Sequence, residues 1–194
     1  MSVIEYVSVF VSIVLGLAVA ELGTSFHRLM RARERVRWHW MSLALAFFML
    51  LNILAVWWAS YLWYATKLEL RMMEFLPDLA ILVLTYLAAA AALPDDIPSD
   101  GLDLKDYYFR TAPYFWSLNA LLLALAIVIL GPRYTHGFDI MVIAKEQVAN
   151  IVLLALAIAL IFVRRPWFHA LAIAYIVGST AWDYLTGALN LHAG

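Results

Sequence analysis

Six long apolar segments follow one another along the chain, with short polar stretches between them. They cover approximately residues 3–27, 40–65, 72–93, 112–131, 140–163 and 166–189. A helix needs roughly 20 apolar residues to cross the hydrocarbon core of a bilayer, and each segment reaches that length. Inside lipid the backbone has to satisfy its own hydrogen bonds, which favours helices. The pattern therefore predicts an all-α, polytopic integral membrane protein: a six-helix bundle that forms a single transmembrane domain over residues 1–194.

Composition agrees with that class of protein and excludes several others. Of the 194 residues, 65% are hydrophobic and 14% are charged, and the mean hydropathy of +0.85 is too high for an ordinary water-soluble protein. The formal net charge of -1 gives no basic footprint for nucleic acid. Cysteine is absent, which excludes disulfides, thiolate metal sites and a cysteine nucleophile.

Lysine and arginine are distributed unevenly between the two sets of alternate loops. One set holds nine of them: Arg28, Arg31, Arg33, Arg35, Arg37, Lys105, Arg110, Arg164 and Arg165. The other set holds three: Lys67, Arg71 and Arg133. Short loops rich in Lys and Arg stay on the cytoplasmic side of a membrane. We therefore expect a multi-pass protein of the bacterial inner membrane, or an equivalent cell membrane, with both termini on the outer (periplasmic) side.

The longest loop, residues 94–113, is acidic and lies on the predicted cytoplasmic side. Part of it resembles a calcium-binding loop, but Pro98 and Tyr107 occupy positions that require ligands. We expect a solvated turn instead, in which Asp103 caps a short interfacial helix over 104–110.

The first segment carries small residues four positions apart. They are Ser8, Ser12, Gly16, Ala20 and Thr24. Such a ridge lets helices approach closely in lipid, where no hydrophobic effect drives them together. The ridge predicts a packing surface, either within one bundle or between subunits of a homo-oligomer.

Ionisable residues cluster near the outer ends of three segments. Asp78, Lys145, Glu146 and Asp183 are placed at similar depth, with Asn150 about one and a half turns further in from Lys145. Charged groups at membrane depth normally turn toward a cavity or toward each other. The pattern predicts an outward-open polar pocket, with Lys145 paired to Asp183. The alternative is a wet helix rim at the membrane interface.

Glu21 is isolated from that cluster, about 10 Å inside the predicted inner boundary. Two interpretations stay open. It is either a proton or cation site at an inner gate, or a residue tethered by Ser25 and Arg28, which follow on the same helix face.

Asn52, Asn119 and Asn150 lie at graded depths in three different segments. Polar groups arranged in this way can line a path across the membrane. Asparagine side chains also hold transmembrane helices together, so each of them has a structural alternative.

Templates for catalysis or cofactor binding are missing from the sequence. The five histidines are scattered at predicted interfaces without ligand spacing, and no nucleophile elbow, phosphate-binding glycine loop or zinc protease motif is present. We therefore expect no enzyme activity, no metal and no cofactor.

These patterns favour a homo-oligomeric channel or transporter for a small cation or proton. In this interpretation Glu21 forms the inner gate, and Asp78, Glu146, Asp183 and Lys145 form the outer vestibule. The alternative is a non-conducting scaffold or sensor subunit that docks a partner through its Arg-rich and acidic loops.

Overall fold

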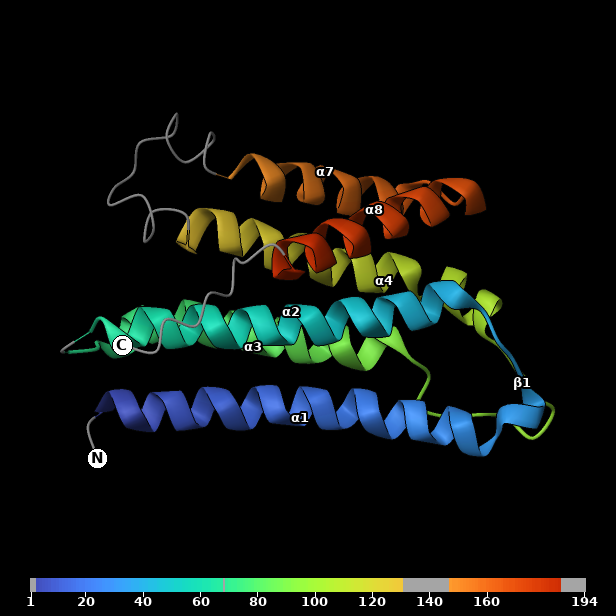
Figure 1. Ribbon diagram of the computed structural model, residues 1–194, viewed down its shortest axis with the longest axis horizontal. Coiled ribbons are helices and arrows are strands. Elements are labelled where there is room, and N and C mark those ends of the chain that lie inside the picture. Colours follow the sequence, from blue (N-terminus) through green and yellow to red (C-terminus); the bar gives the residue numbers. More distant parts are fainter. Residues whose placement is uncertain (1–2, 68, 131–146, 186–194) are drawn as a thin grey trace.

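The computed structural model describes residues 3–67, 69–130 and 147–185, which form a bundle of helices along one long axis (Figure 1). The helices are α1 (Val3–Arg31), α2 (Trp40–Ala65), α3 (Met72–Ala92), α4 (Leu104–Leu125), α7 (Val148–Phe162) and α8 (Pro166–Leu185). A single turn of π-helix, η2 (Ala126–Leu130), continues α4. The predicted all-α class is confirmed.

Four helices of the described part are long and apolar enough to cross a membrane. They are α1, α2, α3 and α4, the last including the turn that extends it to Ile129. α7 has 15 residues and is shorter than a full span. The predicted fifth segment, 140–163, also includes residues 140–146, which lie outside the described residues, so the count of six spans stays a prediction.

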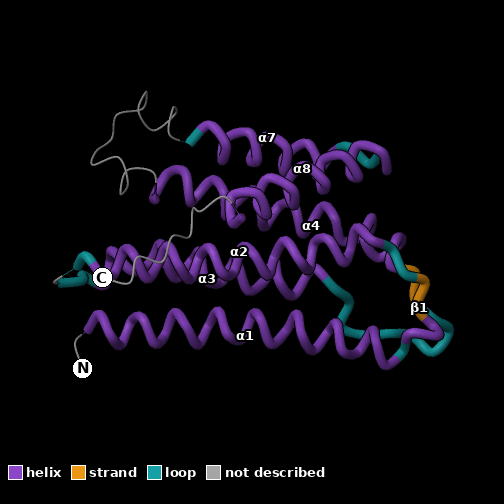
Figure 2. The backbone as a smooth tube through the Cα atoms, in the orientation of Figure 1, coloured by secondary structure: helices purple, strands orange, loops and turns teal. Residues whose placement is uncertain are grey.

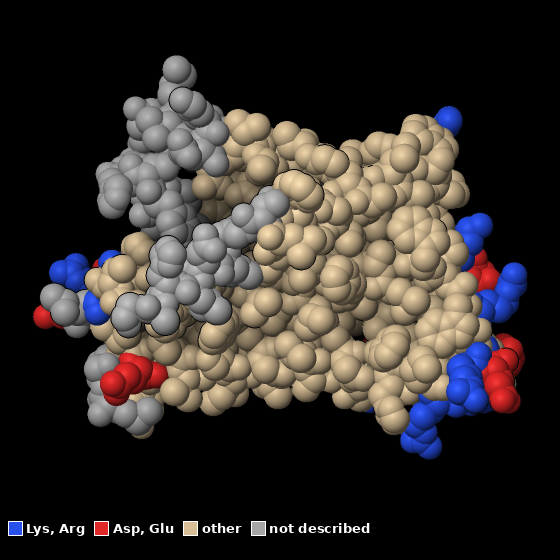
Figure 3. Space-filling model, in the orientation of Figure 1, with Lys and Arg blue, Asp and Glu red and all other residues tan. Residues whose placement is uncertain are grey.

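Charged side chains gather at the two ends of the bundle, with an uncharged band between them (Figure 3). One end contains the α1–α2 connection, the α3–α4 loop and the α7–α8 turn (Figure 2). We call it the Arg-rich end, because it carries Arg31, Arg33 and Arg35. The start of α1 and the α2–α3 connection lie at the opposite end. This separation is the distribution expected of a protein that spans a bilayer.

The prediction of a separate interfacial helix over 104–110 is wrong. α4 begins at Leu104 and continues through Pro113. Its first turns bury Leu104 and Tyr108, so this segment packs onto the bundle instead of lying on the membrane. The predicted cap is confirmed, since Asp103 Oδ1 accepts hydrogen bonds from the backbone N–H groups of Lys105 and Asp106 at 2.8 and 3.3 Å.

A short parallel bridge joins two loops at the Arg-rich end, a feature that the all-α prediction did not contain. β1 (Val36–Arg37) pairs with β2 (Leu102–Asp103), so that Val36 lies opposite Leu102. Gly101 precedes the bridge with a φ of 102°, and a Cβ there would lie 2.8 Å from the Arg35 carbonyl oxygen. Glycine permits both the conformation and the close approach.

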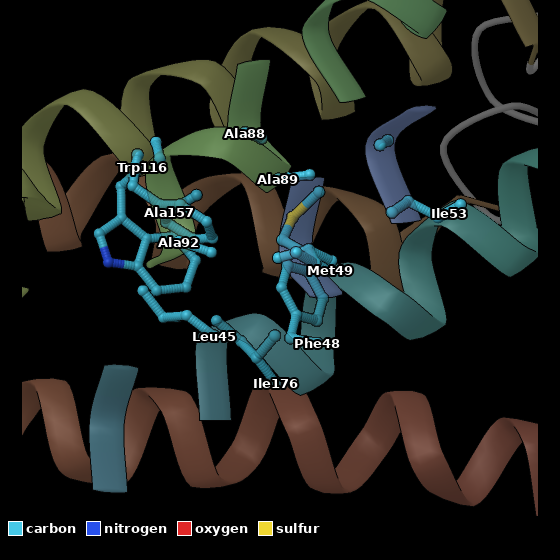
Figure 4. Close-up of a cluster of buried hydrophobic side chains, with 14 of the residues drawn as sticks. Leu45, Phe48, Met49, Ile53, Ala88, Ala89, Ala92, Trp116, Ala157 and Ile176 are labelled. Atoms are coloured by element: carbon cyan, nitrogen blue, oxygen red, sulfur yellow. The ribbon is translucent and has the colours of Figure 1, made fainter. Parts of the chain in front are cut away.

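The core of the bundle is formed where neighbouring helices pack on one another. α1 packs on α2 and α3, α4 packs on α3 and α7, and α8 packs on α2. Figure 4 shows side chains from different helices converging there, among them Phe48 and Met49 of α2, Ala89 of α3, Trp116 of α4 and Ile176 of α8. The alanines of α3 leave room for the larger residues of its neighbours.

The small-residue ridge of α1 lies mostly outside the buried face of this helix. Val11, Leu15, Ala18 and Leu22 form the buried face of this helix. Of the ridge residues, Ser8 is half-buried, and Ser12, Gly16, Ala20 and Thr24 are exposed. Most of the ridge is therefore accessible to lipid or to another subunit, although Ser12 Oγ accepts a hydrogen bond from Trp57 Nε1 of α2 at 3.3 Å.

Candidate functional site

A cavity of about 370 Å³, here called the larger chamber, lies between α2, α4, α7 and α8. Most of its wall is apolar or aromatic, with Phe48, Trp58 and Trp116 among the lining residues. Its polar lining residues come from all four helices: Asn52, Asn119, Asn150, Thr180 and Tyr184. The three asparagines that the sequence places at graded depths thus surround one space.

A second cavity of about 190 Å³, the smaller chamber, lies between α2, α3, α4 and α7. It is lined by Asp78 and Ser60 and shares Asn52 and Asn150 with the larger chamber. The two chambers adjoin along these shared residues. Asp78 therefore lies beside the same space as the asparagines.

Small residues make the room for both chambers. Ala55 and Ala59, four residues apart on one face of α2, line both of them. Ala126, at the start of the π-helical turn, lines the smaller chamber. π-Helical turns inside helices are frequent at functional sites, and here the turn borders the chamber that contains the carboxylate.

Asp78 is held in place by Tyr64, toward the end of the bundle opposite the Arg-rich end. The Tyr64 hydroxyl donates to Asp78 Oδ2 at 2.6 Å, and the two residues are 2% and 8% exposed. They meet because the last turn of α2 lies against the start of α3 in the helical hairpin. A buried carboxylate is costly and normally faces a cavity or a partner, and Asp78 has both.

The asparagine side chains differ in how they are bonded. Asn52 Oδ1 is buried and accepts no hydrogen bond from the residues that the structure describes. The Asn119 side-chain amide donates to the Phe115 carbonyl at 3.0 Å, and that of Asn150 donates to the Gln147 side chain. A buried acceptor without a partner costs about 1–3 kcal/mol. The junction of the chambers therefore favours an occupant that donates a hydrogen bond or carries positive charge.

A buried hydrogen-bonded chain lies between the larger chamber and the Arg-rich end. Trp116 Nε1 donates to the Tyr108 hydroxyl at 3.3 Å, and that hydroxyl is bonded to His169 Nδ1. His169 Nε2 lies 2.6 Å from the Val163 carbonyl, which can only accept. Nε2 therefore carries the proton, Nδ1 accepts from Tyr108, and every member of the chain is satisfied.

The structure places Glu21 apart from both chambers. It is half-buried on α1, a helix that contributes no described residue to either chamber. The alternative prediction, that Ser25 and Arg28 tether Glu21, is wrong. Ser25 Oγ donates to Asp95 Oδ1 at 3.2 Å, and Arg28 Nη1 donates to the Asp95 carbonyl at 2.9 Å.

Three members of the predicted outer cluster cannot be compared with Asp78. Lys145 and Glu146 lie outside the described residues, and α8 includes Asp183 without a described side chain. The predicted pairing of Lys145 with Asp183 therefore stays a prediction.

Several residues of the site were missed in the sequence. Tyr64, Thr180 and Tyr184 were not among the predicted site residues, and His169 was expected at an interface, although it is 1% exposed. A signal existed for Tyr64, because a helical hairpin with a short connection brings the last turn of one helix near the first of the next. His169 had no such signal, since its partner Tyr108 is 61 residues away.

Metal binding has no support within the described residues, among which no group of three or more His, Asp or Glu side chains could hold an ion. Comparison of the chain with protein-family models, curated proteins and solved structures gives no match. The geometry of the chambers is therefore the basis for assigning a function.

Proposed function

We propose that this protein is a homo-oligomeric channel or transporter for a small cation or proton, and that the two chambers lie on its path. The observation that carries the proposal is the convergence of Asn52, Asp78, Asn119 and Asn150, from four different helices, on adjoining cavities. Polar and ionisable groups at membrane depth are costly and commonly mark ion or substrate pathways.

The proposal assigns the charged position on the path to Asp78 in place of Glu21. Asp78 borders a chamber, and its carboxylate is oriented by Tyr64. The position of Asp78 beside neutral amides provides one negative charge among several acceptors, a combination suited to a monovalent cation or a proton. The exposed small residues of the α1 ridge support assembly into oligomers, because small residues permit close contact between helices.

Flux measurements on purified protein in liposomes test this assignment. Asp78→Asn should lower the flux of the conducted ion roughly tenfold or more, the effect of losing about 1.4 kcal/mol of interaction. The amide can still accept the Tyr64 hydroxyl, so thermal stability should change little. Glu21→Gln, at a carboxyl of α1 that lines neither chamber, should conduct like the wild type. Loss of flux in Glu21→Gln with normal flux in Asp78→Asn would overturn the path through the chambers.

A scaffold or sensor subunit is the second candidate, and one observation favours it. Arg31, Arg33 and Arg35 are exposed, and no ion pair joins them to another residue in the described parts of the chain. Two residues of the acidic loop are instead bonded to other arginines of the same chain. The Asp95 carbonyl accepts from Arg28, and the Asp103 carboxylate forms an ion pair with Arg37. A partner would therefore meet a basic surface. If liposomes that contain the protein conduct no tested ion, including protons, the channel or transporter function is overturned and the scaffold or sensor function takes its place.

A further inference from the structure

The larger chamber has more apolar room than an inorganic ion requires. Its volume is about 370 Å³, and its wall includes Phe48, Trp58 and Trp116. Binding sites for small organic molecules have volumes of about 300–1,000 Å³, with mostly apolar and aromatic walls and a few placed polar groups. An engineered apolar cavity of about 150 Å³ already binds benzene. The chamber therefore has room for an aromatic ring or a similar apolar group.

The smaller chamber adds a negative charge next to that room. Asp78 is the only charged side chain that lines either chamber in the described part of the chain. The Tyr64 hydroxyl orients this carboxylate by donating a hydrogen bond to Oδ2. A cationic group bound beside the carboxylate is attracted to it in a medium of low dielectric constant, whereas a neutral group gains no such attraction.

The hydrogen-bonding groups where the two chambers meet also favour a ligand that donates a hydrogen bond. Asn52 Oδ1 has no donor among the described residues and lies at the boundary of the two chambers. The side chains of Trp116, Asn119 and Tyr184 already donate to other groups of the protein. An ammonium group supplies N–H donors and a positive charge together.

We infer that the adjoining chambers bind a small organic ammonium compound. Its charged nitrogen lies in the smaller chamber at Asp78 and Asn52, and its apolar body lies in the larger chamber against Trp58 and Trp116. The aromatic walls also favour a cation nearby through cation–π attraction. The inference rests on the proposed function and deepens it by naming the class of substrate.

Binding of 2-phenylethylammonium to the purified full-length chain, measured by titration calorimetry in detergent, tests the inference. The neutral analogue 2-phenylethanol has the same ring and chain, and ethylammonium has the charge without the ring. We expect the first compound to bind at least roughly tenfold more tightly than either of the others, because each control lacks one of the two recognised features. Equal binding of the ammonium compound and the alcohol would overturn the inference.

Two variants locate the binding. Asp78→Asn should weaken binding of 2-phenylethylammonium at least roughly tenfold, whereas Asp96→Asn, at an exposed loop position, should not change it. Ala59→Phe places a ring where both chambers meet and should abolish binding, whereas Ala174→Phe adds the same ring on an exposed face of α8 and should leave binding intact. Binding that survives Ala59→Phe in folded protein would place the ligand elsewhere and overturn the inference.

Flux in liposomes separates this inference from the function on which it rests. Uptake of labelled 2-phenylethylammonium that depends on Asp78 would support both. Flux of sodium, potassium or protons that depends on Asp78, without binding or uptake of the ammonium compound, would overturn the inference and keep the proposed function. Liposomes that carry neither inorganic ions nor the ammonium compound would overturn both.

Discussion

Asp103 is a single side chain that joins two segments at the Arg-rich end. Its carboxylate caps α4 through the backbone N–H groups of Lys105 and Asp106, and it forms an ion pair with Arg37 at 3.2 Å. The hydrogen bond from Lys105, with smaller contributions from Asp106 and Arg37, holds the pKa of this carboxyl below its ordinary value. The ionised form of Asp103 is therefore the one that stabilises the fold.

The lowered pKa predicts how the contribution of Asp103 depends on pH. A carboxyl whose pKa is lower in the folded state stabilises the protein above its unfolded pKa, and the effect disappears as the pH falls through the folded pKa. Asp103→Ala should lower the thermal midpoint at pH 7. The difference from the wild type should shrink as the pH falls below about 4, the ordinary pKa of Asp, and vanish once the pH is below the folded pKa. Asp103→Asn should keep most of the stability, because Asn is also a good N-cap. A difference that persists unchanged at low pH would contradict this role of the ionised carboxyl.

At the scale of elements, α8 is attached at its two ends by different bonds. Near its start, His169 is bonded to Tyr108 of α4, and near its end the Tyr184 hydroxyl donates to the Leu51 carbonyl of α2 at 2.6 Å. Both bonds bridge elements far apart in the sequence. They hold α8 in the position from which Thr180 and Tyr184 line the larger chamber.

Removal of the Tyr108 hydroxyl tests the first attachment. Tyr108→Phe leaves His169 Nδ1 and Trp116 Nε1 without their partner in a buried environment, which should cost about 1–3 kcal/mol for each orphaned group. Equilibrium unfolding in mixed micelles measures the loss. Tyr114→Phe, at an exposed position of the same helix, should stay within about 0.5 kcal/mol of the wild type. Equal effects of the two substitutions would show that the hydroxyl of Tyr108 stabilises nothing.

At the scale of the molecule, two charged ends are separated by an uncharged band (Figure 3), which is the distribution expected of a protein that spans a bilayer. The Arg-rich end carries most of the lysines and arginines of the chain. This asymmetry predicts that the Arg-rich end is cytoplasmic.

Cysteine labelling in intact cells checks that orientation against a clean background, because the chain has no cysteine of its own. Cysteine introduced at Thr66, which is exposed in the α2–α3 connection at the opposite end, should react with an impermeant reagent added outside. Cysteine introduced at Glu34, exposed at the Arg-rich end, should react only after the membrane is permeabilised. The reverse pattern would invert the topology.

The sequence by itself determined the class of protein and most helix limits. The second segment was predicted over 40–65, and α2 has the same limits. Runs of apolar residues are local, and so are caps such as Asp103, which bonds residues two and three positions away. Properties set by neighbouring residues can be derived without knowledge of the fold. The continuity of α4 with the helix predicted over 104–110 was missed, because burial of Tyr108 against other helices decides that these first turns belong to the bundle.

Only the tertiary structure decided which polar residues meet. Sequence spacing predicts the depths of Asn52, Asn119 and Asn150 in three different helices. The rotation of each helix about its axis determines whether these side chains face the same cavity. The packing of large apolar surfaces sets that rotation, and a single polar residue has little influence on it. Likewise Ser25 and Arg28 were expected beside Glu21, whereas the fold brings Asp95 to them from about 70 residues away along the chain. Contacts between distant residues depend on the sum of all packing interactions. The sequence therefore singled out Asp78 as a site residue, but the chamber that it shares with the asparagines became recognisable only in three dimensions.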